Sequence, residues 1–386
     1  MSNENSKDKK VANVPNLRFG TGLISMPIIS DVSGLRKTTK VFPKTLYIST
    51  ENLISDFGGC KKFSENIPIK GTYFKRGDTL VANIRPYLKK VFFAAFDGCA
   101  SSDVLVFQPK KVFPLYFFYC LANEKFINYI MLNAKGSKMP RGDKGWMLKK
   151  KIAIVPLEEQ KKTALFLSLI DERIVVQNKI ISAYKSLMKP LFECMNDGGG
   201  QEFCIDEIGT YYSCDSLSWD EMSSKGYPAI IYGQLFTDYS LIIQDIVGHT
   251  KKQISSKSKG NDLLFPSSTT VDSLSLISPA SLSIVDISLG GDMFFIALNE
   301  GFNCDYLSLL INFEYRKQLA RFAQGSTIIH LYYESIKNFK LLIAPKEIQE
   351  KIVNCEKQII KIIDVENKLL NCLEEQKKYF LKNLFI

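Results

Sequence analysis

Two short segments combine cationic side chains with turn residues, a pattern suited to binding phosphates and base edges. The first reads NIRPYLKK over residues 83–90, and the second reads GSKMPRGDK over residues 136–144. Together they hold six cations: Arg85, Lys89, Lys90, Lys138, Arg141 and Lys144. Lysine and arginine on loops can reach phosphate oxygens, and arginine can donate two hydrogen bonds to a guanine in the major groove. For any single lysine, a solvated loop charge is the favoured explanation, but the two loops together within one basic region favour binding to nucleic acid.

The charge of the chain is unevenly distributed. The formal net charge over 386 residues is +10, yet residues 1–150 alone hold 25 Lys and Arg against 11 Asp and Glu. A basic region attracts polyanions, so we expect this one to face nucleic acid or, on charge alone, an anionic membrane surface. Residues 200–340 are net acidic, and we expect any anion contact there to be focused on a serine-rich loop. That loop contributes Lys251, Lys252, Lys257 and Lys259.

Motifs of catalysis and metal binding are not found in the sequence. There is no phosphate-binding P-loop, no dinucleotide fingerprint and no nucleophile elbow, and two histidines offer little general-base capacity. Nine cysteines form no C-x-x-C pair, which argues against a zinc site and favours a reducing compartment. With no signal-like apolar start and no long apolar span, we expect a cytoplasmic protein without a membrane segment, a catalytic site, a cofactor or a metal.

An internal repeat organises the chain. The segment from Pro156 to Phe192 matches the segment from Pro345 to Leu381 without a gap, and both begin Pro-x-Glu-x-Gln. The same offset brings Gly136-Ser137 onto Gly325-Ser326. The chain is therefore expected to be a tandem duplication in which a variable region is followed, twice, by a long helix.

Each repeated segment has the marks of a long helix. A proline and acidic residues stand at its start, where a missing donor and the helix dipole favour them. Apolar residues then follow at alternating spacings of three and four, which predicts a coiled-coil seam held for about three heptads, on a helix roughly 55 Å long at ~1.5 Å per residue. The seam is predicted at Ile170, Ile174, Gln177 and Ile181 in the first helix, and at Ile359, Ile363, Glu366 and Leu370 in the second. Pro190 predicts a bend or fraying near the end of the first helix.

The variable regions are predicted to be mixed globular domains, so the fold class is α+β. Short apolar runs over 90–96, 104–107 and 284–287 are predicted strands bounded by turns. One helix is predicted in each region, over 114–132 and 304–323. We place the boundaries at 1–150 for the basic region, 151–197 for the first helix, 198–340 for the second region and 341–386 for the last helix.

In order and duplication, several motifs closely resemble the specificity subunit of type I restriction–modification systems. They are VPNLRF at 14–19, Tyr47–Leu53, RGDTL at 76–80, Asn83–Tyr87, Ser101-Ser102-Asp103, the loop at 136–141 and the repeated helix start. The second region fits more loosely, through Lys259–Leu264 and Gly325-Ser326-Thr327. The resemblance adds Ser102 and Thr327 to the candidate DNA-binding residues.

This resemblance implies two target recognition domains, each reading one half of a split, asymmetric DNA sequence. The two long helices would pack as an antiparallel coiled coil that spaces the domains and docks modification subunits, two per chain. Adenine methylation with S-adenosylmethionine, and ATP- and Mg-dependent translocation and cleavage, would reside in partner modification and restriction subunits. Two alternatives stay open: the specificity subunit of a stand-alone defence methyltransferase, and a coiled-coil scaffold that binds only protein.

Overall fold

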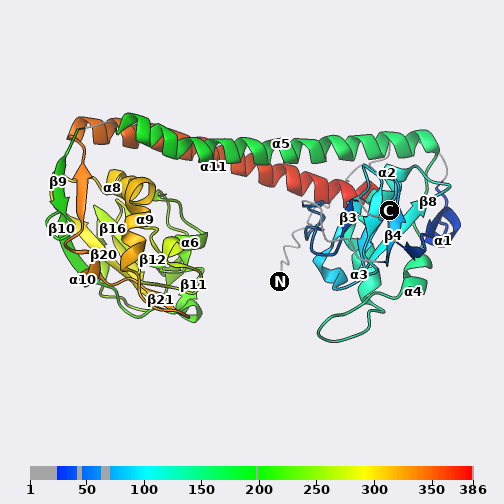
Figure 1. The fold of residues 1–386 in the computed structure, drawn as a ribbon, viewed down its shortest axis with the longest axis horizontal. Helices are drawn as coiled ribbons and strands as arrows, with labels where there is room; N and C mark the ends of the chain where they lie inside the picture. The colour runs from blue at the N-terminus through cyan, green and yellow to red at the C-terminus, as the bar shows by residue number, and fades with distance from the viewer. Residues whose placement is uncertain (1–23, 41–45, 62–69, 197–198, 385–386) are drawn as a thin grey trace, which may run out of the picture. The chain divides into compact units, whose positions relative to one another are not determined.

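The computed structural model describes residues 24–40, 46–61, 70–196 and 199–384. The VPNLRF motif at 14–19 and residues 197–198 of the glycine-rich linker lie outside this set. The chain forms two compact units (Figure 1). The first combines residues up to Asn178 with those from Leu369 onward, and the second comprises Lys179–Lys368. The predicted boundaries separate helices from domains, whereas each compact unit contains part of both long helices.

The first unit contains two four-stranded sheets. One has the order β1-β8-β5-β6, all antiparallel: Ser33–Leu35, Val104–Pro109, Thr79–Ala82 and Val91–Phe93. The other has the order β2-β4-β7-β3: Thr38–Lys40, Lys70–Phe74, Gly98–Ala100 and Tyr47–Ile48. The short helices are α1 (Ile29–Val32), η1 (Pro86–Leu88), α2 (Pro114–Leu121), α3 (Glu124–Met131) and α4 (Lys144–Leu148). Apolar residues of the first sheet and of α2 and α3 form the main core of this unit.

The second unit repeats this plan with more strands. Its first sheet has the order β10-β20-β16-β18-β13: Gly209–Ser213, Met293–Leu298, Asp262–Pro266, Ala280–Leu282 and Ile242–Ile243. Its second has the order β11-β14-β12-β19-β15: Met222–Ser223, His249–Thr250, Tyr227–Ile231, Val285–Gly290 and Lys257–Lys259. In both units one central strand, β5 or β16, lies antiparallel between two neighbours.

Smaller elements complete the second unit. Two strand pairs are β17 with β21 (Ser268–Thr269, Ile329–His330) and β9 with β22 (Gln201–Cys204, Lys340–Ile343). The helices are η2 (Trp219–Glu221), α6 (Gln234–Thr237), α7 (Ser273–Leu276), α8 (Cys304–Leu310), α9 (Arg316–Leu319), η4 (Ala320–Phe322) and α10 (Tyr333–Ile336). Between α8 and α9 lies a π-helical turn, η3 (Ile311–Tyr315). The predicted α+β duplication is confirmed.

Both long helices begin with the same hydrogen bond. In α5 (Leu157–Met195), the side-chain amide of Gln160 donates to the carbonyl oxygen of Val155 at 2.7 Å. In α11 (Lys346–Leu384), Gln349 donates to Ala344 at 2.8 Å. Because each acceptor precedes the helix-starting proline, the glutamine ties the incoming chain to the first turn. Local structure thus accounts for the glutamine of the repeated motif.

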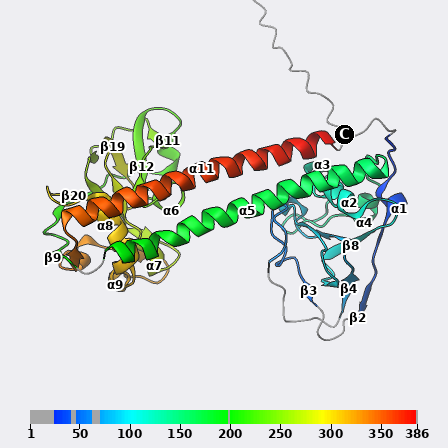
Figure 2. The same cartoon turned by 90° about the horizontal axis from the view of Figure 1, so that it is seen from above.

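The long helices pack antiparallel, as predicted. In the first unit the start of α5 lies beside the end of α11 (Figure 2), where the rings of Phe166 and Phe380 are 4.8 Å apart. Lys377 Nζ lies 2.6 Å from Asp171 Oδ1, and the hydroxyl of Tyr119 on α2 donates to the same carboxylate at 2.7 Å. The domain and both helices therefore share one polar junction.

Burial along both helices follows the predicted seam. The predicted seam residues are buried or half-buried: Ile170, Ile174, Gln177, Ile181, Ile359, Ile363, Glu366 and Leu370. Leu169 and Val365, one position away from seam residues, are 53% and 62% exposed. Position in the heptad, rather than side-chain type, therefore decides which residues are covered.

Two local predictions need correction. The helix expected over 114–132 is broken at Asn123, whose side chain accepts the amide hydrogen of Lys125 and caps α3. The segment at 251–259 is expected to be a loop throughout, but its last three residues, Lys257–Lys259, form a strand that pairs with β19. The first long helix, α5, continues past Pro190 to Met195, just before the predicted glycine-rich stop.

One seam position of α11 buries an acid. Glu356 is 1% exposed, and neither carboxylate oxygen has a hydrogen-bond partner among the described residues. Its counterpart in the first repeat is Leu167, which is fully buried. Burial raises the pKa of Glu356 to about 7.

We expect Glu356→Gln to stabilise the chain in a pH-dependent way. The folded-state pKa exceeds the ~4.3 of an unfolded glutamate, so the stability of the wild type falls between about pH 4 and 7 and then stays low. In urea unfolding, the variant should gain about 1–3 kcal/mol over wild type at pH 8 and almost nothing at pH 4.5. Glu350→Gln, at an exposed site on the same helix, is the control. An equal gain in the free energy of unfolding at both pH values would contradict the raised pKa of the buried Glu356 carboxyl.

Candidate nucleic-acid interface

Three segments that are distant in sequence meet at one edge of the first unit. The amide of Asn83 donates to the carbonyl oxygen of Asp103 at 2.8 Å, and the amide of Gly142 donates to Asn83 at 3.0 Å. The amide of Arg85 donates to Pro140 at 2.8 Å. We call residues 83–85, 101–103 and 140–142 the first loop cluster. It brings together three of the segments that the sequence singled out.

Strand pairing explains this convergence. β5 ends at Ala82 and β8 begins at Val104, and these two residues are partners in the antiparallel ladder. The residues just after β5 and just before β8 must therefore leave the sheet at the same edge. The cluster is held by backbone hydrogen bonds.

The third segment is a closed loop. Lys135 and Arg141 exchange backbone hydrogen bonds of 2.9 and 2.8 Å, which fixes residues 136–140 between them. Gly136 has a φ of +100°, and a Cβ atom there would lie 3.3 Å from the carbonyl oxygen of Met139. Glycine is therefore favoured at 136 by the turn itself.

Arg141 is oriented but remains accessible. Its Nη1 lies 3.0 Å from Asp103 Oδ1, while its side chain is 58% exposed. A surface ion pair of this kind contributes little to stability. Its physical effect is to restrict the guanidinium group while leaving donors free for a ligand.

Arg85 lies beside Arg141 on strained backbone. Arg85 and Lys89 bracket η1, with φ values of +50° and +54°. This left-handed conformation is uncommon for residues other than glycine and collects at functional sites. Arg85 is exposed, and Tyr87 between them is 45% exposed. The turn therefore presents a cation and an aromatic ring together.

The remaining candidates of the first unit fall into two groups. Ser102, Lys138 and Lys144 are exposed within or next to the first loop cluster. Lys89 and Lys90 are engaged within the fold: Lys90 Nζ donates to the carbonyl oxygen of Thr50 at 2.7 Å. Lys89 Nζ lies 2.8 Å from Glu124 and 3.4 Å from Asp56. The hydrogen bond to Glu124 raises the pKa of Lys89.

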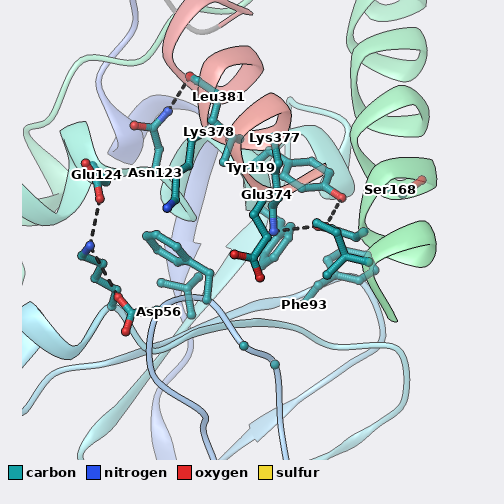
Figure 3. A pocket seen from close by; sticks show the side chains of 18 of the residues that line it. Asp56, Phe93, Tyr119, Asn123, Glu124, Ser168, Glu374, Lys377, Lys378 and Leu381 are labelled. Atoms are coloured by element: carbon teal, nitrogen blue, oxygen red, sulfur yellow. Dashed lines mark hydrogen bonds and ion pairs between the residues drawn. The ribbon is translucent and has the colours of Figure 1, made fainter. Parts of the chain in front are cut away.

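A cavity of about 1080 Å³ opens beside Lys89 in the same unit (Figure 3). Its wall joins α2 and α3 to parts of α5 and α11, and combines phenylalanines with charged side chains. Asp171 and Lys377 pair across it, and the side-chain amide of Asn123 donates to the carbonyl oxygen of Leu381 at 2.8 Å. These contacts tie the helices to the domain, so we assign the cavity to the junction.

In the second unit the lysine candidates are spread over several elements. Lys252 Nζ lies 2.7 Å from Glu221, and Lys257 donates to Ser288 Oγ at 2.6 Å. Lys259 lies over the ring of Tyr212 at 5.5 Å, and Lys251 is exposed. Thr327 is also exposed, in a separate loop before β21. The structure does not show these lysines as one cluster.

The sequence indicated the loops but missed how they interlock. Asp103 was visible only as part of a Ser-Ser-Asp motif, and its ion pair with Arg141 depends on tertiary structure. Among described residues no group of His, Cys, Asp and Glu is arranged to hold a metal ion. In the same ranges no helix has the length and apolar character needed to cross a membrane.

Known proteins share this architecture. One similar solved structure is described as "Structural basis underlying complex assembly and conformational transition of the type I R-M system". It is 14% identical in sequence to this chain, with a TM-score of 0.59, and the match covers 94% of this chain and 97% of the chain in that structure. The type I restriction–modification system S subunit from M. genitalium is 16% identical, with a TM-score of 0.58, covering 96% and 99%. No curated protein sequence matches this chain.

The sequence itself matches a family model twice. The model, a type I restriction modification DNA specificity domain, covers residues 43–183 and again 199–375. These two stretches make up most of the chain. The first contains the strands from β3 to β8 and part of α5, and the second contains both five-stranded sheets and part of α11. The chain therefore belongs to the type I restriction modification DNA specificity domain family, and it carries that domain in duplicate.

Proposed function

We propose that this chain is the sequence-specific DNA-binding subunit of a type I restriction–modification complex and is itself non-catalytic. Each globular region reads one half of a split, asymmetric target in double-stranded DNA. Two modification subunits dock on the long helices and methylate adenine with S-adenosylmethionine. Restriction subunits supply the ATP- and Mg-dependent steps, and the complex works in the cytoplasm.

The first loop cluster carries the DNA-binding part of this proposal. It presents Arg141, held by Asp103 and still accessible, beside the exposed Arg85. Lys138 and Lys144 add exposed charge in the same neighbourhood, within a basic region. Oriented arginines read guanine, whereas mobile lysines hold phosphates. A cluster with both kinds of side chain suits sequence-specific binding.

Exposed apolar residues on the long helices support protein docking. In the first unit, Leu165, Leu169 and Val176 on α5 are each more than 50% exposed, and their spacing places them on one face. In the second unit, Ile362 and Val365 on α11 are 37% and 62% exposed. Apolar residues gathered on one surface commonly mark a protein interface. Each unit therefore offers one such surface, which suits two docked subunits.

We expect Arg141→Ala to change DNA recognition at one position. Loss of a base contact should cost about 1–3 kcal/mol of binding free energy, confined to one position of the first half-site. Arg85→Ala should behave in the same way if Arg85 also reads a base. Lys138→Ala should weaken all sequences alike and lower the salt slope by about one. Competition binding with a panel of single-base target variants separates these effects.

The control is Lys111→Ala, which removes an exposed cation just beyond the opposite end of β8. It should leave the sequence preference unchanged. Unaltered affinity and preference in both arginine variants would remove the first loop cluster from the interface.

We expect two methyltransferase subunits per chain, bound through the helix faces. The double variant Leu165→Ser with Leu169→Ser should bind the modification (methyltransferase) subunit of its complex about tenfold more weakly or worse at one of two sites. Leu132→Ser, at a 78% exposed residue after α3, is the matched control. Mass measurement of the reconstituted complex gives the stoichiometry. An active complex with one methyltransferase per chain would contradict the proposal.

A further inference from the structure

The second unit contains a loop cluster built with the same backbone hydrogen bonds as the first. The amide of Ser267, just after β16, donates to the carbonyl oxygen of Asp292 at 2.7 Å. The amide of Leu331 donates to Ser267 at 2.9 Å, and Ser268 pairs with His330 across β17 and β21. We call residues 267–268, 290–292 and 329–331 the second loop cluster.

The loop that enters this cluster is also closed in the same way. Gln324 and His330 exchange backbone hydrogen bonds of 2.8 and 2.7 Å, as Lys135 and Arg141 do in the first unit. Gly325 has a φ of +120°, and a Cβ atom there would lie 2.0 Å from the carbonyl oxygen of Ile328. The loop between them, which includes Thr327, is exposed.

These shared contacts align the two clusters residue by residue. Asp292 takes the position of Asp103, and His330 takes the position of Arg141, each 189 residues later in the chain. The offset is that of the repeated helices, although the lysine loop at 251–259 has no part in this correspondence. Backbone geometry is therefore kept while the outward side chains differ.

The side chains of the second cluster present different hydrogen-bonding groups. Asp292 accepts a hydrogen bond from Ser268 Oγ at 2.6 Å, and no ion pair to it is seen within the described ranges. His330 is half-buried and stacks against Tyr332, with ring centroids 5.9 Å apart. The two ring nitrogens of an imidazole point in different directions, so it cannot offer the two parallel donors of an arginine.

We propose that the second half-site is read at the second loop cluster, with His330 as a specificity-determining residue in the place that Arg141 holds in the first. This inference rests on the proposed function and refines it. The base that His330 contacts is chosen by a single donor or acceptor, whereas Arg141 selects guanine. The lysines at 251, 252, 257 and 259 then contribute only charge.

The decisive variant is His330→Arg. Because Asp292 occupies the position of Asp103, an arginine at 330 should be held as Arg141 is and should select guanine. Selection from a random double-stranded DNA library with the full-length chain should show guanine gained at one position of the second half-site. The preference for guanine there should rise about tenfold or more, corresponding to the lower range of a bidentate contact.

Two further variants make the result specific. His249→Arg places the same new charge on β14 of the same unit, at a residue that is not part of the second loop cluster, and should leave both half-sites unchanged. His330→Gln adds no charge and should also alter the one position, which keeps the test valid if His330→Arg fails to fold.

The possible failures are distinguishable. Native preference in both half-sites for folded His330 variants would overturn the assignment while leaving the proposed function intact. A change in the first half-site would overturn it as well. A wild-type chain that selects no bipartite sequence would contradict the proposed function, and the assignment with it.

Discussion

A single type of backbone hydrogen bond underlies both candidate binding surfaces. The amide just after the central strand donates to the carbonyl of the residue just before the neighbouring strand, in one unit from Asn83 to Asp103 and in the other from Ser267 to Asp292. This bond continues the antiparallel ladder by one step and holds two loops at the same sheet edge. Because it involves no side chain, the loops can change their outward residues without losing their positions.

This separation explains how the two halves of a duplicated chain can differ in recognition. The strands and the closed glycine loops are maintained in both units, and so is the glutamine bond that begins each long helix. Arginine and histidine then occupy corresponding positions on the two surfaces. A duplicated scaffold that presents different side chains at corresponding positions is suited to an asymmetric DNA target.

The long helices were predictable from sequence because their signals are local. A proline start, acidic first turn and three-four spacing each depend on residues within a few turns of one another. The same reasoning failed at Asn123, where an apolar run concealed a helix cap, and at Lys257–Lys259, which is a strand only because β19 lies beside it. The ion pair of Arg141 with Asp103 and the correspondence of His330 with Arg141 depend on strand pairing between distant segments. No local pattern reveals them.

Methylome sequencing of the host, with and without this gene, tests the central claim most directly. If the chain directs a methyltransferase to a split target, its deletion should remove methylation from one bipartite, asymmetric adenine motif and from no other. Restoring the gene should restore that motif. A methylome that is identical with and without the gene, in cells that express the chain and its partner, would contradict this account.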